Sequence, residues 1–448
     1  MFSALVNSFK IPDLKRRLII TGALIAVYRV GCYVPTPGID GTALAQFFAN
    51  VNRAQGGAGA LFGIINMFSG GAMERLTIFA LGIMPYISSS IIMQLLTAVI
   101  PALEKLAKEG QAGYQRINQY TRYGTVVLSV IQSFFIALWL ENPARFEGLR
   151  IVMYPGWGFR ILTVLTLTTG TIFIMWLGEK IQERGVGNGI SLVISAGIIS
   201  RIPAALHQLA VLLSPAHRQI QPYKLVVMSF LLVAVIFAVI LITQGLRKIP
   251  VQYARRIVGR KVFGGQSTYI PLKVDQSGVI AIIFAQSIIL FPATLASFIP
   301  NPAFQSLAQS LMRGHLLYTV IYAAFIIFFC YFYTAIVFNP IDLADNMKKY
   351  GGFIPGIRPG KPTAEFLDFV MTRITLAGAI FMAFIAIFPD AVMASFQVPY
   401  LVASFFGGTG ILIIVGVMLD TLKQIESHLL MHHYDGFIKG GRIKGRRA

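Results

Sequence analysis

Residues 157–177 read WGFRILTVLTLTTGTIFIMWL, and this stretch decides the kind of fold that the chain adopts. The stretch is apolar almost throughout, with Trp157 and Trp176 near its two ends. As a helix, the segment from one tryptophan to the other is about 28 Å long, close to the thickness of a bilayer's hydrocarbon core. Tryptophan is enriched at both membrane interfaces. The stretch is therefore predicted to be a transmembrane helix.

The whole chain has the composition of a membrane protein. Of its 448 residues, 56% are hydrophobic and 12% are charged, whereas a soluble domain carries roughly 25% charged residues. The mean hydropathy is +0.70. Apolar blocks of about 20 residues recur along the chain, and they do not alternate as the strands of a membrane barrel do. We therefore expect an all-α polytopic membrane protein.

Ten spans are predicted, at residues 18–34, 76–97, 123–140, 157–177, 186–205, 223–243, 276–298, 316–338, 370–388 and 400–419. The first, fifth and ninth are the least regular, since Arg29, Arg201 and Arg373 fall within them or at their edges. Cys32 and Cys330 both lie in apolar segments, where small buried thiols are a simpler interpretation than a disulfide.

The net charge of +20 is concentrated in alternate loops. Of the 38 Lys and Arg residues, 28 lie in residues 1–17, 98–122, 177–187, 244–275, 339–373 and 420–448. Because Lys and Arg gather on the cytoplasmic side of membrane proteins, these segments and both termini are predicted to be cytoplasmic. Topology accounts for most of the positive charge, so no recognition of a specific nucleic-acid sequence is expected.

Two of these loops, 244–275 and 339–373, are long. The first contains QYARRIVGRKVFGGQSTYIPLKVD, in which short β-like runs alternate with basic clusters, and a hairpin is predicted there. The second contains NPIDLADNMKKYGGFIPGIRPGKPT, whose glycines and prolines favour a rigid, turn-rich tip around Arg358. Such loops suit either the docking of a large cytoplasmic partner or the binding of anionic lipids, and composition does not choose between the two.

A short apolar segment lies between the first two spans, where residues 58–71 read AGALFGIINMFSGG. As a helix, its run LFGIINMF (61–68) would be only about 12 Å long, too short to cross a bilayer. Flanking glycines let the backbone turn at either end. On these residues alone, a half-helix at the membrane interface is the favoured interpretation.

Five long motifs distinguish this chain from ordinary transporters. They are NMFSGGAMERLTIFALGIMPYISSSIIMQLL (66–96), ERGVGNGISLVI (183–194), QSTYIPLKVDQSGVIAIIFAQSIILFPAT (266–294), FFCYFYTAIVFNP (328–340) and GGFIPGIRPGKPTAEF (351–366). Together they resemble the bacterial SecY family, the pore-forming subunits of the protein-conducting channel. The resemblance covers essentially all of residues 10–445.

The resemblance implies a fold of two pseudo-symmetric, inverted halves of five transmembrane helices, closed like a clamshell around the path of a polypeptide. Here the halves would be residues 18–215 and 216–419, between a cytoplasmic N-terminal tail (1–17) and a basic cytoplasmic C-terminal tail (420–448). A side opening between the second, third, seventh and eighth spans would release apolar segments into lipid. The sequence shows no convincing internal repeat, although inverted repeats are often weak in sequence.

The resemblance also assigns a seal to the pore. A collar of bulky apolar side chains passes any polypeptide, while dewetting keeps ions out. By match to the family's motifs, this pore ring would be Ile83, Ile87, Ile194, Ile283 and Ile413. The short segment at 61–68 would be the plug that blocks the resting pore, formed by Leu61, Phe62, Ile64, Ile65, Asn66, Met67 and Phe68.

Two further groups of residues carry over from the family. Gln94 and Asp275 match the polar lateral gate at the side opening, although family members often have Asn at the position of Asp275. Arg260 and Lys261 match the basic tip of one long loop, and Arg358 matches that of the other. In the family both loops bind the SecA motor or the ribosome.

The function implied is a gated, passive conduit for secretory and membrane protein precursors in the bacterial inner membrane, driven by the SecA motor ATPase or a translating ribosome. Small SecE- and SecG-like membrane subunits and anionic lipids are the other expected partners. Motifs such as HExxH, GxSxG and GxxxxGK[ST] are absent from the sequence, so no catalytic residue, metal or cofactor is expected.

Two alternative functions fit the sequence less well. A secondary transporter usually places Asp, Glu or His deep in the membrane for ion coupling, and the ten predicted spans hold no Asp or Glu. An insertase works from an open groove and would not need a plug.

Overall fold

The computed structural model describes residues 11–53, 66, 69–142, 146, 150–213, 221–253, 256–258, 261–263, 267–298, 316–396, 398, 400–403, 405 and 408–440. Its contacts form two compact units, which we describe separately. Unit 1 comprises residues 1–90, 115–207 and 413–448, and unit 2 comprises residues 91–114 and 208–412. These two units are defined by contacts and do not test the predicted symmetry. The predicted halves, residues 18–215 and 216–419, and the two terminal tails therefore stay a prediction.

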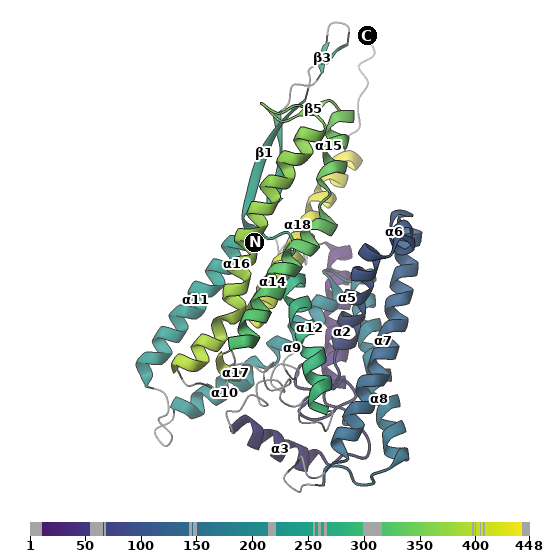
Figure 1. The fold of residues 1–448 in the computed structure, drawn as a ribbon, viewed down its shortest axis with the longest axis vertical. Helices are drawn as coiled ribbons and strands as arrows, with labels where there is room; N and C mark the ends of the chain where they lie inside the picture. The colour runs from purple at the N-terminus through teal and green to yellow at the C-terminus, as the bar shows by residue number, and fades with distance from the viewer. Residues whose placement is uncertain are drawn as a thin grey trace. The chain divides into compact units, whose positions relative to one another are not determined.

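The described chain is mostly helical, as predicted (Figure 1). The helices are α2 (Pro12–Gly31), α3 (Gly41–Arg53), α5 (Met84–Val99), α6 (Pro101–Lys108), α7 (Gln111–Leu140), α8 (Trp157–Arg184), α9 (Gly189–Ile199), α10 (Ile202–Leu213), α11 (Pro222–Gln244), α12 (Val279–Phe298), α14 (Leu316–Val337), α15 (Pro340–Lys349), α16 (Lys361–Phe396), α17 (Tyr400–Ala403) and α18 (Thr409–Gly440). The strands are β1 (Leu246–Tyr253), β2 (Arg256–Val258), β3 (Lys261–Phe263), β4 (Ser267–Lys273) and β5 (Gly352–Phe353).

Each predicted span overlaps one or two of these helices. Among the described residues, six helical stretches are long and apolar enough to cross a membrane, or seven if the sharply bent pair α5 and α6 is one span. The remaining spans correspond to helices that are shorter or more charged than this criterion allows. The all-α polytopic class holds, while the ends of individual spans differ from the prediction.

The second span starts later than predicted. Residues 69–83 form turns, and the helix begins only at Met84. One reason is that the Thr36 N–H donates a hydrogen bond to the Leu76 carbonyl at 3.1 Å. Leu76 also has a φ of 42°, which no α-helix accommodates. The backbone at the start of the predicted span makes tertiary contacts instead of regular helical hydrogen bonds. A prediction from the apolar pattern alone therefore placed the start of this helix too early.

The fifth and tenth spans are interrupted. Ser200 and Arg201 form a turn between α9 and α10, and Pro203 stands at the start of α10. Proline has no N–H to continue a helix but is tolerated in a first turn, which explains a restart at this point. The tenth span likewise consists of the single turn α17 and the long helix α18, with Gly408 at a φ of 93° just before α18.

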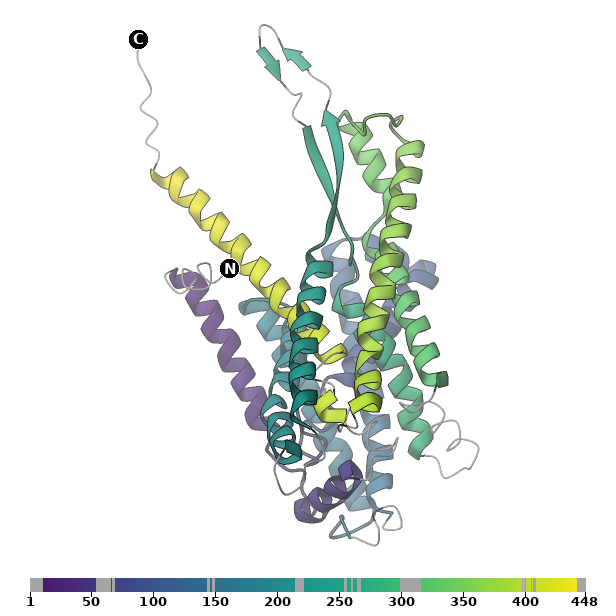
Figure 2. The same cartoon turned by 90° about the vertical axis from the view of Figure 1, so that its left-hand side faces the viewer.

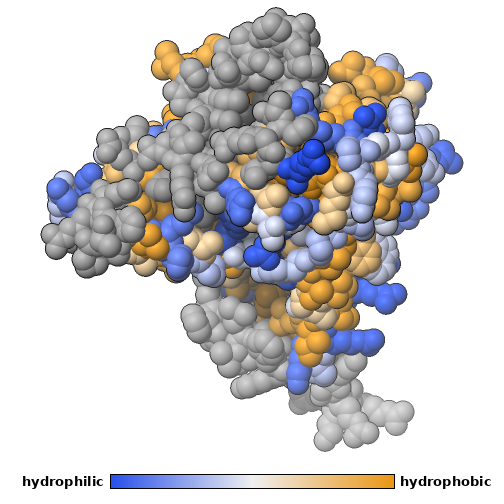
Figure 3. Space-filling view, turned by 90° about the horizontal axis from the view of Figure 1, so that it is seen from below, coloured by the Kyte–Doolittle hydropathy of each residue, from blue (hydrophilic) through white to orange (hydrophobic). Residues whose placement is uncertain are grey.

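Large apolar side chains remain at the surface of the long helices. On α11, Val226 and Phe230 expose 70% and 73% of their surface. On α8, the bracketing Trp157 and Trp176 are 67% and 44% exposed. In the space-filling view, orange hydrophobic residues reach the surface beside blue hydrophilic ones (Figure 3). Such apolar surface is unfavourable in water and suits helices that face lipid.

Unit 1 contains a helix that the sequence did not predict. Helix α3 begins after Asp40, whose carboxylate accepts the Thr42 N–H at 2.9 Å as a helix cap. Its Phe47 ring packs edge-on against Phe146 and Trp139, with centroids 4.7 and 6.2 Å away. The helix is amphipathic and too polar to resemble a span, so a search for apolar blocks passes over it.

Unit 1 is also tightly packed where α2, α8 and α9 meet. A side chain on Gly31 of α2 would collide with the Phe79 ring, and that ring stacks between Tyr28 and Phe173, each with its centroid 6.0 Å away. The α8–α9 turn is fixed in the same unit, because the Gly187 N–H donates to the Gln424 side chain of α18 at 2.8 Å.

Unit 2 contains the predicted hairpin. Strands β1 and β4 pair antiparallel, with Ile249 opposite Ile270, and β2 pairs with β3 at the tip (Figure 2). The hairpin prediction for 244–275 is therefore confirmed. The second long loop contributes β5, which pairs with the other edge of β1 to give the strand order β4-β1-β5.

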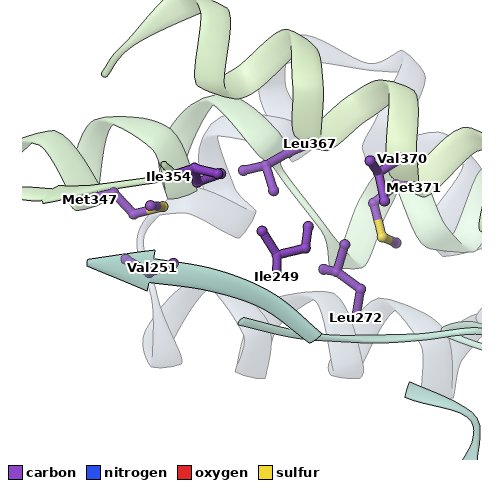
Figure 4. Packing of buried hydrophobic residues seen from close by; sticks show 8 residues of the cluster. All are labelled: Ile249, Val251, Leu272, Met347, Ile354, Leu367, Val370 and Met371. Atoms are coloured by element: carbon purple, nitrogen blue, oxygen red, sulfur yellow. The ribbon is translucent and has the colours of Figure 1, made fainter. Parts of the chain in front are cut away.

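One face of this sheet is covered by α15 and α16. Alternate residues of a strand point to the same face, which brings Ile249, Val251 and Leu272 together on the covered side (Figure 4). We call the resulting cluster the loop core; its buried members are Ile249, Val251, Leu272, Met347, Ile354, Leu367, Val370 and Met371. Helix α16 in turn packs against α14 and α11 (Figure 1).

Candidate functional site

Reciprocal hydrogen bonds join Asn66 of the predicted plug to Glu74 in the turns that follow it. The Asn66 side-chain N–H donates to the Glu74 carboxylate at 2.8 Å, and the Glu74 backbone N–H donates to the Asn66 side-chain oxygen at 3.2 Å. The Gly71 N–H donates to the Asn66 carbonyl at 2.8 Å. Asn66 is therefore joined to both Gly71 and Glu74.

Glu74 also forms an ion pair with Arg201, which lies in the turn after α9. The Arg201 Nη1 to Glu74 Oε2 distance is 2.7 Å, and the two side chains are 15% and 31% exposed. The buried Arg201 Nε has no hydrogen-bond acceptor among the described residues. Because a guanidinium removed from water needs a compensating charge, the Glu74 carboxylate is important for the position of Arg201.

A second attachment lies four residues before Glu74, at Gly70. Arg29 of α2 donates to the Gly70 carbonyl at 2.9 Å. Gly70 has a φ of 66°, and a Cβ there would lie 3.1 Å from the Gly197 Cα of α9. Only glycine suits both the left-handed backbone and the close approach. The positive φ agrees with the prediction that the flanking glycines let the backbone turn.

The two cysteines have separate environments. The Cys32 thiol lies 3.8 Å from the Ser69 carbonyl, and the Cys330 thiol lies 3.5 Å from the Ser277 hydroxyl. Both are buried and free, so the interpretation without a disulfide is confirmed. No group of three or more His, Cys, Asp or Glu side chains within the described part of the chain could hold a metal ion.

The five residues of the predicted pore ring are all buried. Four belong to unit 1 and Ile283 to unit 2. Ile83 precedes α5, but the Ile87 N–H donates to the Ile83 carbonyl at 3.1 Å, so these two residues remain one helical turn apart. Their exposed fractions are Ile83 1%, Ile87 4%, Ile194 1%, Ile283 5% and Ile413 0%. Burial is equally expected of ordinary core residues, so the ring stays a prediction.

Only one residue of the predicted plug is described. Asn66 is helical and 5% exposed. The other six lie outside the described residues: Leu61, Phe62, Ile64, Ile65, Met67 and Phe68. The plug assignment stays a prediction.

The predicted lateral gate residues differ in their surroundings. Asp275 precedes α12 and is 7% exposed. Its carboxylate accepts the Gly278 N–H at 2.8 Å and the Ser277 hydroxyl at 3.2 Å. A carboxylate at this place satisfies a free backbone N–H and suits the positive end of the helix dipole. Gln94 is half-buried in α5. Their role in a side opening stays a prediction.

The predicted docking residues lie on the two long loops. Lys261 begins β3 at the hairpin tip, while Arg260 lies outside the described residues. Arg358 is exposed in the turn between β5 and α16, and its carbonyl accepts the Thr363 hydroxyl at 2.9 Å. Because β5 pairs with β1, both basic tips extend from one folded body. Docking of a partner there stays a prediction.

The ion pair of Glu74 and Arg201 was not predicted from the sequence. One signal was available, because Arg201 interrupts an apolar stretch and a charge in apolar surroundings usually has a partner. The partner lies 127 residues earlier in the chain, and no local spacing points to it.

Comparison with known proteins places the chain in a family. A model of the SecY family matches residues 77–422. The protein translocase subunit SecY of Vibrio cholerae is 46% identical over 442 residues, covering 97% of this chain and 96% of the relative. The same subunit of Escherichia coli K12 is 46% identical over 439 residues, with coverage of 97% and 96%. That of Streptomyces galbus is 47% identical over 446 residues, with coverage of 98% and 100%.

Solved structures agree in fold. The chain is similar to one described as a protein conducting channel, with a TM-score of 0.63, 16% identity, and coverage of 94% of this chain and 96% of the other. A structure that describes the plug domain of SecY gives a TM-score of 0.62 at 18% identity, with the same coverage. Sec61 in a canine ribosome-channel complex gives 0.59 at 15% identity, again with the same coverage. These identities support the fold alone, but the sequence relatives go further, and this chain belongs to the SecY family of protein translocase subunits.

Proposed function

We propose that this chain is the central, pore-forming subunit of a bacterial protein translocation channel. The observation that carries the proposal is the match to relatives named protein translocase subunit SecY, which extends over 97% or more of the chain at 46% to 47% identity. The multi-helical membrane fold supports it, because the unpaired backbone groups of an extended polypeptide are costly in lipid, and the polypeptide therefore needs a path lined by protein.

The proposed mechanism is passive. The chain forms a gated pore for secretory polypeptides and a side opening that releases transmembrane segments into the bilayer. Five buried isoleucines suit a narrow constriction, because apolar walls keep a pore dry and so limit the passage of ions. The energy comes from a partner, either a SecA motor ATPase or a ribosome. We assign no catalytic step to this chain.

The proposed partners bind the chain in two places, within the bilayer and at the cytoplasmic side that carries the basic loops. The bacterial relatives support an inner-membrane location, and the distribution of Lys and Arg supports an orientation with both termini in the cytoplasm. The joined loops that carry Lys261 and Arg358 would then extend towards a motor or a ribosome. Structures that describe Sec61 and Ssh1 in ribosome complexes support the ribosome as a partner. SecE- and SecG-like subunits and anionic lipids complete the proposed complex.

The test is reconstituted translocation. The chain is purified in mild detergent with co-expressed small subunits, incorporated into vesicles, and supplied with the motor ATPase, ATP and a secretory precursor. We expect ATP-dependent protection of the precursor from added protease, and no protection in vesicles without the chain. If the precursor stays fully digestible while the vesicles take up a small solute along an ion gradient, the chain is a secondary transporter instead.

A further inference from the structure

We propose that Glu74, together with Arg201 and Asn66, is a lock that keeps the channel in its resting state. The inference rests on the proposed function, because a resting state has meaning only for a gated pore. All three residues belong to unit 1 and to the described part of the chain. We call these three side chains the resting lock.

The first argument is the convergence of two contacts on one oxygen atom. Glu74 Oε2 accepts from Arg201 Nη1 at 2.7 Å and from Asn66 Nδ2 at 2.8 Å. A single carboxylate therefore links a residue assigned to the plug with the end of α9. Movement of Asn66 away from α9 has to break one of these two hydrogen bonds. Charge-assisted hydrogen bonds are roughly twice as strong as neutral ones, so this link resists separation.

The second argument is the burial of the charge. Arg201 is 15% exposed, and its Nε already lacks an acceptor among the described residues. Removing the carboxylate would leave an uncompensated guanidinium in a largely enclosed site, which is strongly unfavourable. The arrangement with Glu74 in place is therefore favoured over one in which the segment has moved.

The third argument is the register of the contacts. Gly70 lies against Gly197, and Glu74 pairs with Arg201, so both partners advance by four residues. Gly197 lies in the last turn of α9, and Arg201 lies in the turn that directly follows this helix. Gly70 therefore contacts the end of α9, and Glu74 pairs with the turn after that helix, so the position of these residues is fixed at two points rather than one.

These contacts lead to a specific expectation. With Glu74 neutralised, the Arg201 charge loses its counterion, and the bond to Asn66 loses its ionic acceptor. Asn66 and the turns at residues 69–74 should then leave their position more often. The resting pore should conduct more ions and should accept precursors with weaker signal sequences.

The experiment compares Glu74→Gln, Arg201→Gln and the exchange of both charges, Glu74→Arg with Arg201→Glu. The matched control is Glu179→Gln, which breaks the bidentate pair of Glu179 with Arg122 (2.8 and 2.9 Å) elsewhere in unit 1. The readout is the ion conductance of purified channels in planar bilayers without precursor. We expect a rise of roughly tenfold in the single variants, since a tenfold shift needs only about 1.4 kcal/mol. The exchanged pair should return most of the way to the parent.

A second readout does not depend on translocation. The native Cys32 thiol is 3% exposed and lies against the Ser69 carbonyl, so it reports directly on the seating of this segment. In a Cys330→Ala background, a membrane-permeant maleimide should label Cys32 faster in Glu74→Gln than in Glu179→Gln.

The outcomes separate the two proposals. Equal conductance and equal labelling in Glu74→Gln and Glu179→Gln would overturn the resting lock, even if the parent translocates normally. Faster labelling of Cys32 in a protein that never translocates would leave the lock as an anchor of this segment and would overturn the channel function. Increased conductance in all variants, the control included, would also contradict the lock, because the effect would not be specific to Glu74.

Discussion

Gln252 of β1 pairs with Phe353 of β5, so two loops that are far apart in the sequence share one sheet. The same sheet packs through the loop core onto α15 and α16. The hairpin and the turn that carries Arg358 are therefore one folded body in unit 2, and damage to one loop should disturb the other.

The loop core should be sensitive to truncation at Leu367, which is 0% exposed. Leu367→Ala should destabilise the joined loops by about 2–5 kcal/mol, the usual range for a buried leucine. Limited proteolysis of the hairpin and thermal unfolding in detergent measure the effect. Ile341→Ala is the control, because Ile341 of α15 is 64% exposed and its removal leaves no cavity. Equal losses at the two positions would show that the cluster does not hold the loops.

The docking assignment predicts a loss of transport on charge reversal. Arg358→Glu, or Arg260→Glu combined with Lys261→Glu, should reduce motor-dependent translocation at unchanged channel abundance, because opposite charges steer association and reversal repels the partner. Lys224→Glu at the start of α11 supplies the same charge change away from both loops. Full transport in both docking variants would remove these residues from the interface.

The pore-ring assignment predicts a leak. Ile87→Ser with Ile283→Ser should admit water, because hydroxyl groups wet a narrow apolar wall. The same change weakens the closed state by roughly 2–5 kcal/mol per site if each side chain is fully packed. Conductance and the export of a reporter with a crippled signal sequence measure the result. Ile92→Ser, at a position that is 45% exposed on the same helix as Ile87, is the control. No gain in either readout would show that the pair does not line a gate.

The close packing of α2 predicts opposite effects at two glycines. Gly31→Ala should destabilise unit 1, because the new methyl group would collide with the Phe79 ring. Gly22 has no atom within 4 Å of an added Cβ. Gly22→Ala should therefore stabilise α2 by about 0.5–1 kcal/mol, since alanine loses less backbone entropy than glycine. Thermal unfolding of the two variants side by side is the measurement, and a shift in the same direction for both would contradict this account.

The class and most of the helices could be predicted because apolar blocks of bilayer length are a strong local signal. The hairpin was predictable for a similar reason, since alternating residues and turn-forming glycines act over a few positions. Residues 76–83 were assigned wrongly because their conformation depends on a hydrogen bond from Thr36, a contact that no local pattern contains. Tertiary contacts of this kind override a weak helical preference.

The candidate site was predictable only where a motif marked it. The isoleucines and the basic loop tips came from the family resemblance, and nothing in their spacing distinguishes them from packed or exposed residues of the same type. The pair of Glu74 and Arg201 depends on two segments that meet only in the folded chain. The sequence showed one unsatisfied charge, and only the fold supplied its partner.

The attachment of the hairpin to α16 also has a mechanical consequence. With 36 residues, α16 is about 54 Å long as a helix, well beyond the roughly 30 Å of a bilayer's hydrocarbon core. The loop core includes Leu367, Val370 and Met371 from the first turns of that helix, so the sheet packs directly against them. Packed apolar contacts are stiff, whereas a flexible loop would absorb a load by bending. A force applied to the paired strands β1 and β4 would therefore reach α16 as a torque, so that these strands would act as a lever arm on a membrane-crossing helix.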